Sequence, residues 1–379
     1  MSTILRRLTD ELVADLEQDV VDSRQPESAI SIDRYLSPSI LDAERAKIFA
    51  RVPIVVAHAS DVADVGQTVV DSSSGRSVIV VRGKDGVLRA FVNACRHRAT
   101  RLASESCTRK AFVCPYHGWT YSLDGELLSV PHKEAFTSLP VARRNLVSVP
   151  VAERHGLVWL NAADTFAVAN HLGVLDDELG ALAIGSHVVF ETRQCERDAN
   201  WKLVMDLFLE GYHLRTLHRN SIYPFFVDSR GKLASFGDHV GAVSARRTIG
   251  EATPTDLDRS LRDYVTPNFV LFPNTVLIGH PDYYSLLRVV PLATNRVKWI
   301  HSLLIPRAPE NDSEREHWQR SLDLIEGKVF QKEDLWMAEE MQRGIESSAD
   351  DEIVIGKLEV GISWFHDAIA RHLESPTCA

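Results

Sequence analysis

Two short segments, each pairing a cysteine with a histidine, most constrain how this chain can fold. Cys95-Arg-His97 is followed, after sixteen residues, by Cys114-Pro-Tyr-His117. Each segment comes directly after an apolar run typical of a β-strand, VLRAFVNAC in the first case and RKAFVC in the second. Both pairs are therefore expected in loops at strand ends. Two such loops side by side would offer two thiolates and two imidazoles to one metal centre.

These four side chains admit three interpretations. Taken singly, most cysteines are buried core residues and most histidines lie partly at the surface. A tetrahedral zinc ion accepts the same donors, although zinc sites more often use Cys-x-x-Cys pairs. A Rieske [2Fe–2S] cluster binds one iron through two cysteines and the other through two histidines. The spacing and the segment CPYHGWTYSLDGEL resemble the Rieske signature, so we expect Cys95, His97, Cys114 and His117 to bind a [2Fe–2S] cluster.

The pattern of apolar runs along the chain predicts two domains. Short apolar runs separated by Gly and Asp turns predict an all-β domain over residues 45–162. Residues 163–379 combine strand candidates between 265 and 306 with helical periodicity around 165–182, from 200 to about 218, and after 313. They predict an α+β domain, an antiparallel sheet covered by helices. Residues 1–44 are expected to form an N-terminal helical segment that packs on this second domain.

A second set of candidate ligands lies in the segment NWKLVMDLFLEGYHLRTLHR. His213 and His218 are five residues apart, and Glu210 precedes His213 by three. On an ideal helix position 218 lies about 140° around from position 213, so one metal can meet both rings only if the helix unwinds or bulges, with Gly211 as an aid. Most histidine pairs on a helix are ordinary surface or core residues.

Asn200-Trp-Lys, Glu-Gly-Tyr-His and Leu-His in this segment resemble the catalytic helix of Rieske non-haem iron oxygenases. The resemblance implies an Fe(2+) ion bound by His213, His218 and one distant carboxylate. In that family the carboxylate is an Asp followed eight residues later by Gln, which corresponds here to Asp334 and Gln342. Three further acids of the same run compete with Asp334 for the role, namely Glu333, Glu339 and Glu340.

The resemblance also assigns a catalytic role to Glu210. It stands where the family carries a bridging carboxylate, usually Asp, between the mononuclear iron centre and the cluster of a neighbouring subunit. A hydrogen bond from His213 would orient that ring. Asp206, one turn earlier, is the alternative for this role.

As a whole, the chain resembles the terminal oxygenase, of the α-subunit type, of the aromatic-ring-hydroxylating family. This resemblance implies a Rieske domain, then a helix-grip-like antiparallel sheet whose helices carry the mononuclear iron. It also implies a head-to-tail homotrimer in which one subunit's cluster reduces the next subunit's iron. A NAD(P)H-dependent reductase, in some members with a ferredoxin, would supply two electrons. This reductase must be a separate protein, because the sequence contains neither a dinucleotide fingerprint nor plant-type ferredoxin cysteine spacing.

The expected reaction is hydroxylation of an organic substrate with O2, and we expect an aromatic or cyclic substrate. The alternative is a quaternary ammonium compound, since Glu at the bridging position also occurs among ammonium-oxidising members. From another class, the chain could be a Rieske electron carrier without oxygenase activity. Leu203, Leu207 and Phe208 are the candidate substrate contacts. A cage around a cation could be formed by four aromatic residues, namely Phe225, Phe226, Tyr283 and Tyr284.

Charge and composition exclude other classes of protein. The formal charge of −10 lacks the basic footprint of a nucleic-acid binder. The sequence has no apolar run of the length that a membrane span needs. Five cysteines in 379 residues do not form a disulfide scaffold, and the N-terminal segment lacks the features of a secretory signal. We therefore expect a cytoplasmic protein with no nucleic-acid or membrane partner.

Overall fold

The computed structural model describes residues 3–375 except 24–25, 137, 139–143, 162–163 and 349. The chain divides into two compact units, one of residues 49–171 and one that combines residues 1–48 with residues 172–379. The sequence places the first boundary at residue 45. Its second boundary, between 162 and 163, lies outside the described residues.

The unit of residues 49–171 consists mainly of short antiparallel strands. They are β2 (Ile54–His58), β3 (Gln67–Asp71), β4 (Val78–Arg82), β5 (Leu88–Val92), β6 (Cys107–Thr108), β7 (Phe112–Val113), β8 (Thr120–Tyr121), β9 (Leu127–Ser129), β10 (Ser148–Val149), β11 (Val151–Arg154) and β12 (Leu157–Leu160). Their orders are β10-β5-β4-β3-β6, β11-β12-β2 and β7-β8-β9. Two short helices, η2 (Ala59–Val62) and η3 (Lys133–Phe136), and α4 (Thr165–Leu172) complete the described elements.

Strand β4 separates two apolar clusters in this unit. Because successive side chains of a strand point to opposite faces, Val78 and Val80 enter one cluster with β2 and β12. Ile79 and Val81 enter the other, which contains both cysteines of the Rieske-like segments. The continuous apolar run RSVIVVRG of the sequence thus predicts a strand that is buried on both faces.

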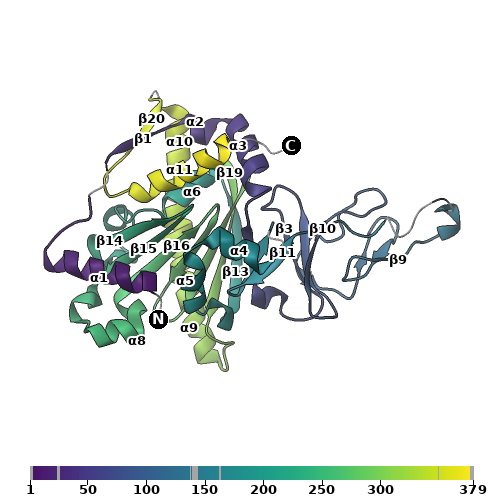
Figure 1. Cartoon of the computed structure of the whole chain (residues 1–379), viewed down its shortest axis with the longest axis horizontal. Helices are drawn as coiled ribbons and strands as arrows, with labels where there is room; N and C mark the ends of the chain where they lie inside the picture. Colours follow the sequence, from purple (N-terminus) through teal and green to yellow (C-terminus); the bar gives the residue numbers. More distant parts are fainter. Residues whose placement is uncertain are drawn as a thin grey trace. The chain divides into compact units, whose positions relative to one another are not determined.

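The second unit is built on a seven-stranded antiparallel sheet with the order β13-β19-β18-β17-β16-β15-β14 (Figure 1). Its strands are β13 (Val188–Arg197), β14 (Phe226–Phe236), β15 (His239–Arg246), β16 (Val265–Leu271), β17 (Thr275–Gly279), β18 (Tyr284–Ala293) and β19 (Arg296–Ile305). A separate pair joins β1 (Ser28–Ser31) to β20 (Glu352–Ile355), near the two ends of the chain. The antiparallel sheet expected from residues 265–306 is confirmed.

The second unit also contains helices, several of which pack on this sheet. They are α1 (Thr3–Glu17), α2 (Asp33–Leu36), α3 (Pro38–Glu44), η1 (Arg45–Phe49), α5 (Leu175–Ala181), η5 (Ile184–Ser186), α6 (Trp201–Asp206), α7 (Leu214–Leu217), η6 (Tyr223–Phe225), η7 (Arg247–Glu251), α8 (Pro254–Tyr264), α9 (Asp312–Leu322), η8 (Asp323–Asp334), α10 (Leu335–Ser347) and α11 (Val360–Glu374). Helices α1 and α11 contact β14 and β15 (Figure 1). Helix α6 contacts β18 and α10. The backbone of η8 is wound as a π-helix.

The α+β fold class is confirmed, but the long helix expected from residue 200 to about 218 is wrong. Helix α6 ends at Asp206, and α7 is a single turn that begins at Leu214. The residues between them form turns. The sequence did not indicate β14 and β15 either, because polar and small residues interrupt both strands and hide the apolar alternation.

Candidate active site

The first candidate centre lies where two loops of the β unit meet. Cys95 and His97 follow β5, and Cys114 and His117 lie in the hairpin loop between β7 and β8. The two imidazole rings are 4.8 Å apart between centroids, and His97 stacks on Trp119 at 4.9 Å. Each cysteine is only 3% exposed, whereas His117 lies at the surface. The structure therefore brings the four residues together, with the sulfurs inside and the imidazoles toward solvent.

Backbone and side-chain hydrogen bonds fix both loops. The Cys114 amide donates to the Trp119 carbonyl at 2.8 Å, and Gly118, at φ +70°, closes the turn with its amide on the Cys114 carbonyl. The Tyr121 hydroxyl accepts the Arg96 amide proton at 2.9 Å and lies 3.3 Å from Cys95 Sγ. Since that oxygen already accepts the amide, its own proton is free to point at the sulfur.

The donor set of this centre fits a [2Fe–2S] cluster. Burial raises the pKa of the Cys95 thiol, so the sulfur needs a nearby cation to be held as a thiolate. Burial, with His117 and Arg98 nearby, lowers the pKa of His97, which keeps that imidazole neutral at pH 7. Two buried sulfurs and two imidazoles are the ligands that a Rieske cluster requires.

The second candidate centre is a buried group of two histidines and one aspartate. One ligand atom from each of His213, His218 and Asp334 lies within 4.8 Å of the other two. Asp334 Oδ1 is 3.0 Å from His218 Nε2 and 3.8 Å from His213 Nε2. The histidines come from the two ends of α7, and the aspartate from the last residue of η8.

A carboxylate stands behind each of the two imidazoles. Glu210 Oε1 is hydrogen-bonded to His213 Nδ1, and Glu333 Oε2 lies 2.8 Å from His218 Nδ1. Glu333 also accepts a hydrogen bond from the Ser221 hydroxyl at 2.6 Å. With both Nδ1 atoms held by carboxylates, both Nε2 atoms are left to face Asp334. This is the carboxylate–histidine arrangement that orients metal ligands in proteins.

The electrostatics of this group, and one buried oxygen of Asp334 without a hydrogen-bond donor in the described part of the chain, are consistent with a bound metal ion. Burial lowers the pKa of each histidine, but the neighbouring carboxylates, Glu210 beside His213 and Asp334 beside His218, outweigh it and raise both pKa values. The site thus favours positive charge. Asp334 Oδ1 is buried and has no hydrogen-bond donor in acceptable geometry among the described residues. Two histidines and one carboxylate are the ligands that non-haem Fe(2+) takes.

The chain reaches this geometry by leaving the helix before His213. The Asn200 side chain caps α6 by accepting the Lys202 amide at 2.9 Å, while Gln342 Oε1 accepts the Asn200 amide at 2.8 Å. The Gln that follows Asp334 by eight residues therefore joins α10 to the start of α6. The unwinding that the spacing of the histidines requires occurs at residues 207–213, not between the two histidines.

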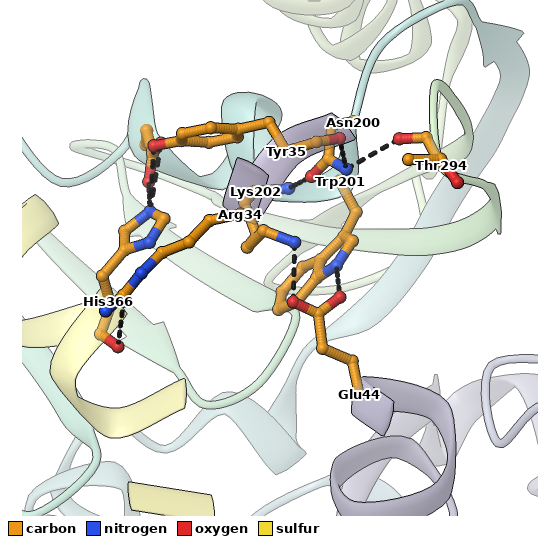
Figure 2. Close-up of polar contacts among 9 residues, drawn as sticks. Arg34, Tyr35, Glu44, Asn200, Trp201, Lys202, Thr294 and His366 are labelled. Carbon is orange, nitrogen blue, oxygen red and sulfur yellow. Dashed lines mark hydrogen bonds and ion pairs between the residues drawn. The ribbon is translucent and has the colours of Figure 1, made fainter. Parts of the chain in front are cut away.

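A buried polar network fixes α6 to the N-terminal segment (Figure 2). Lys202 Nζ lies 2.6 Å from Glu44 Oε1, and Trp201 Nε1 donates to Glu44 Oε2 at 2.7 Å. Tyr35 donates to Asp206 Oδ2 at 2.9 Å, and His366 Nε2 lies 3.1 Å from Asp206 Oδ1. Asp206 is occupied by these contacts and is not bonded to His213, so the alternative that gave it the role of Glu210 is wrong.

The other competing carboxylates point elsewhere. Glu339 accepts the Asp198 amide at 3.2 Å, and Glu340 forms an ion pair with Arg343. The role of Glu333 was missed from the sequence, where it appeared only as a rival of Asp334. Its position next to Asp334 is the one signal that could have placed it near the metal centre.

A cavity of about 240 Å³ opens beside the three candidate ligands. Leu207 and Phe208 line it as expected, but Leu203 does not. Leu203 still lies on the regular helix and faces a second cavity beside Asp206 and Ile345, whereas the turns after α6 redirect the later side chains. The aromatic residues of the cavity wall are Phe208, Phe225, Phe226, Tyr283 and Phe330.

Tyr284, the fourth residue of the expected aromatic cage, lies away from this cavity. Its hydroxyl donates to the Leu182 carbonyl at 3.2 Å, and Arg262 lies over its ring.

Comparison with known protein families shows which kind of metal protein this chain is. The profile of the ring hydroxylating alpha subunit, catalytic domain, matches residues 185–375, and that of the Rieske [2Fe-2S] domain matches residues 52–146. The chain belongs to the ring-hydroxylating oxygenase alpha-subunit family. This oxygenase is thus an iron-dependent oxidoreductase with a [2Fe–2S] cluster and a mononuclear iron. It is the oxygenase subunit of a multicomponent system that needs a separate reductase.

Relatives of this oxygenase act on quaternary ammonium compounds. The carnitine monooxygenase oxygenase subunit of Acinetobacter pittii is 28% identical over 363 residues, which cover 89% of this chain and 93% of the relative. The chloroplastic choline monooxygenase of Atriplex hortensis is 25% identical, over 88% of this chain and 75% of the relative.

Solved structures of related oxygenases share the fold. A quaternary ammonium Rieske monooxygenase in complex with L-carnitine superposes with a TM-score of 0.78 at 24% identity, covering 91% of this chain and 96% of that one. Naphthalene 1,2-dioxygenase from Rhodococcus sp. superposes with a TM-score of 0.76 at 21% identity, covering 99% and 100%. Among the described residues, no helix is both long and apolar enough to span a bilayer.

Proposed function

We propose that this oxygenase is the catalytic component of a monooxygenase that acts on a small quaternary ammonium compound. The observation that carries the proposal is the position of His213, His218 and Asp334 on the wall of a small cavity rich in aromatic rings. A trimethylammonium group binds well to aromatic faces. The carnitine and choline monooxygenases among its relatives support this substrate class over an aromatic hydrocarbon.

In this proposal each metal group has its own ligand set. Cys95, His97, Cys114 and His117 hold the [2Fe–2S] cluster, and His213, His218 and Asp334 hold the mononuclear Fe(2+). When bound, the cluster supplies single electrons and the mononuclear iron supplies the site at which O2 is activated.

The chain's own side chains position the ligands and the substrate. Glu210 and Glu333 hold the two imidazoles so that each Nε2 faces the metal. The apolar residues of η8 and the aromatic residues of the wall exclude water from the reacting carbon. Leu207 and Phe208, at the end of α6, form the part of the wall next to the ligands.

The electron route that we propose runs between copies of the chain. In a head-to-tail homotrimer, Glu210 would link His213 to a cluster histidine of the neighbouring subunit, and a closed ring satisfies every such interface. Electrons would come from NAD(P)H through the reductase, with or without a ferredoxin, in the cytoplasm. Glu210 is suited to this role, because it lies at the boundary of three cavities, including the one that contains the metal ligands.

Oxygen uptake coupled to loss of substrate tests the proposal. The reconstituted oxygenase, with a reductase and NADH, is offered L-carnitine, choline and glycine betaine in parallel with naphthalene and benzoate. We expect coupled uptake with at least one ammonium compound and none with naphthalene. Coupled turnover of the aromatic compounds alone would contradict the proposed substrate class.

A further inference from the structure

One arginine lies in the wall of the cavity that contains the metal ligands. Arg246, the last residue of β15, is the only lysine or arginine among the described residues that line this cavity. Its Nη1 donates to Thr266 Oγ1 at 3.2 Å, and its guanidinium lies 5.7 Å from the centroid of the Phe226 ring. No carboxylate of the described chain is within ion-pair distance of it. A half-buried guanidinium thus has donors to spare inside the cavity.

The other charges of the cavity do not neutralise Arg246. Glu210 is already bonded to His213, and Asp334 belongs to the metal ligands. Burial lowers the pKa of His280 to about 3, so that ring is neutral at pH 7. Asp263 acts on Arg246 only through space. The sheet side of the cavity therefore carries one positive charge without an ion-pair partner among the described residues.

Three further polar residues of the cavity lie on the same sheet face as Arg246. Ser244 pairs with Thr266 across β15 and β16, and Arg246 and Asn268 each lie two residues further along their strands. Because side chains two apart in a strand share a face, all four point to the same side. Asn268 Oδ1 is buried and has no hydrogen-bond partner among the described residues.

The residues that η8 contributes before Asp334 are apolar, namely Leu324, Ile325, Val329 and Phe330. The cavity thus combines a polar sheet face that carries a cation with an apolar wall from η8. Such a cavity suits a substrate that carries a negative group at one end only.

We propose that Arg246 binds a carboxylate of the substrate and thereby selects carboxylate-bearing substrates over purely cationic or neutral ones. This inference rests on the function proposed above and narrows it to zwitterionic ammonium carboxylates. A guanidinium and a carboxylate form paired, charge-assisted hydrogen bonds, which are stronger than neutral ones. A substrate without an anion would leave the guanidinium desolvated and unpaired, which disfavours its binding.

L-Carnitine and choline are suitable probes, because both carry a trimethylammonium group and a hydroxyl and only L-carnitine carries a carboxylate. Binding to the anaerobic holoenzyme is measured by calorimetry, and KM and kcat are measured separately. We expect L-carnitine to bind more tightly than choline. Arg246→Gln should weaken L-carnitine binding by about 10- to 100-fold, the loss of one charged hydrogen-bonded pair, and change choline binding by less than about twofold.

Two matched variants separate this role from a merely structural one. Arg246→Lys keeps the charge and should retain part of the L-carnitine affinity. Arg247→Gln removes the same charge from an exposed neighbour and should leave both affinities unchanged. The absorption spectrum of the cluster and the melting temperature check that each variant is folded.

The outcomes distinguish this inference from the proposed function. If Arg246→Gln weakens both ligands equally, or if choline binds as tightly as L-carnitine, the role of Arg246 is refuted while the ammonium substrate class stands. If benzoate binds in an Arg246-dependent manner and neither ammonium compound binds, the carboxylate role stands and the proposed function fails.

Discussion

In each histidine of the candidate mononuclear site, the two ring nitrogens have different contacts. Nδ1 is fixed by a carboxylate, Glu210 for His213 and Glu333 for His218, and Nε2 faces Asp334. The tautomer and the ring orientation are therefore set before any metal binds. Glu333 is in turn held by the Ser221 hydroxyl. We expect metal affinity to depend on these outer carboxylates as well as on the ligands.

Glu333→Ala tests this dependence. Loss of the carboxylate frees the His218 ring to rotate and lowers its basicity, so the affinity for Fe(2+) should fall by about 10- to 100-fold. Anaerobic titration of the metal-depleted variant with Fe(2+) measures the change. Glu340→Ala is the control, since Glu340 pairs with Arg343 and does not contact the histidines. Equal Fe(2+) affinities in the two variants would show that Glu333 does not support metal binding.

Helix α6 is too short to be stable through its own hydrogen bonds, and buried polar contacts hold it in place. It has six residues, and Lys202 in it is 1% exposed while its partner Glu44 is fully buried. Two buried charges are costly to desolvate, so the pair is tolerated because each partner satisfies the other (Figure 2). Trp201 adds a hydrogen bond to the same carboxylate. The segment around α3 thereby fixes the helix that leads to Glu210.

Breaking this pair should be strongly destabilising. Lys202→Met leaves the Glu44 carboxylate buried without its cation, and the free energy of unfolding should fall by roughly 3–5 kcal/mol. Urea unfolding followed by fluorescence measures it. Removal of an exposed pair by Glu314→Gln, which faces Arg307, should cost less than about 1 kcal/mol. A Lys202→Met variant as stable as Glu314→Gln would show that the buried pair does not hold α6.

The sequence predicted elements well where the apolar pattern is continuous. Residues 265–306 are rich in aliphatic side chains buried in a sheet, and the strands expected there are present as β16 to β19. It failed at residues 207–213, because the helical spacing of apolar residues continues there while tertiary contacts end the helix. Asp334 could be named from a motif, whereas Arg246 could not. Arg246 could not be singled out because its neighbours in the cavity become visible only once β15 pairs with β16, which places it beside Thr266, twenty residues later in the sequence.

At the scale of the whole molecule, the two candidate metal centres lie in separate units of one chain. The profiles of a Rieske [2Fe-2S] domain and of a ring hydroxylating catalytic domain match this one chain, and we propose that both centres serve one reaction. In the trimer that we propose, a carboxylate bonded to a ligand of the mononuclear iron is suited to link neighbouring subunits. Glu210 contacts His213 through one oxygen, while its other oxygen accepts the Tyr212 and His213 amides.

Glu210→Gln should separate electron transfer from metal binding. The amide can still accept a hydrogen bond but has no charge, so both metal centres should remain occupied while product formation slows by about tenfold or more. Single-turnover experiments that follow bleaching and recovery of the cluster absorbance measure this step. Unchanged kinetics in a variant with full metal content would exclude Glu210 from the electron route.

The iron content of the anaerobically reconstituted oxygenase, compared with that of Asp334→Ala, tests the central claim most directly. A cluster of two irons and one mononuclear ion together give about three irons per chain, and the variant should retain about two along with the full absorption of the cluster. Two irons in the unaltered protein, or three in the variant, would contradict the claim that this chain holds a second iron at His213, His218 and Asp334.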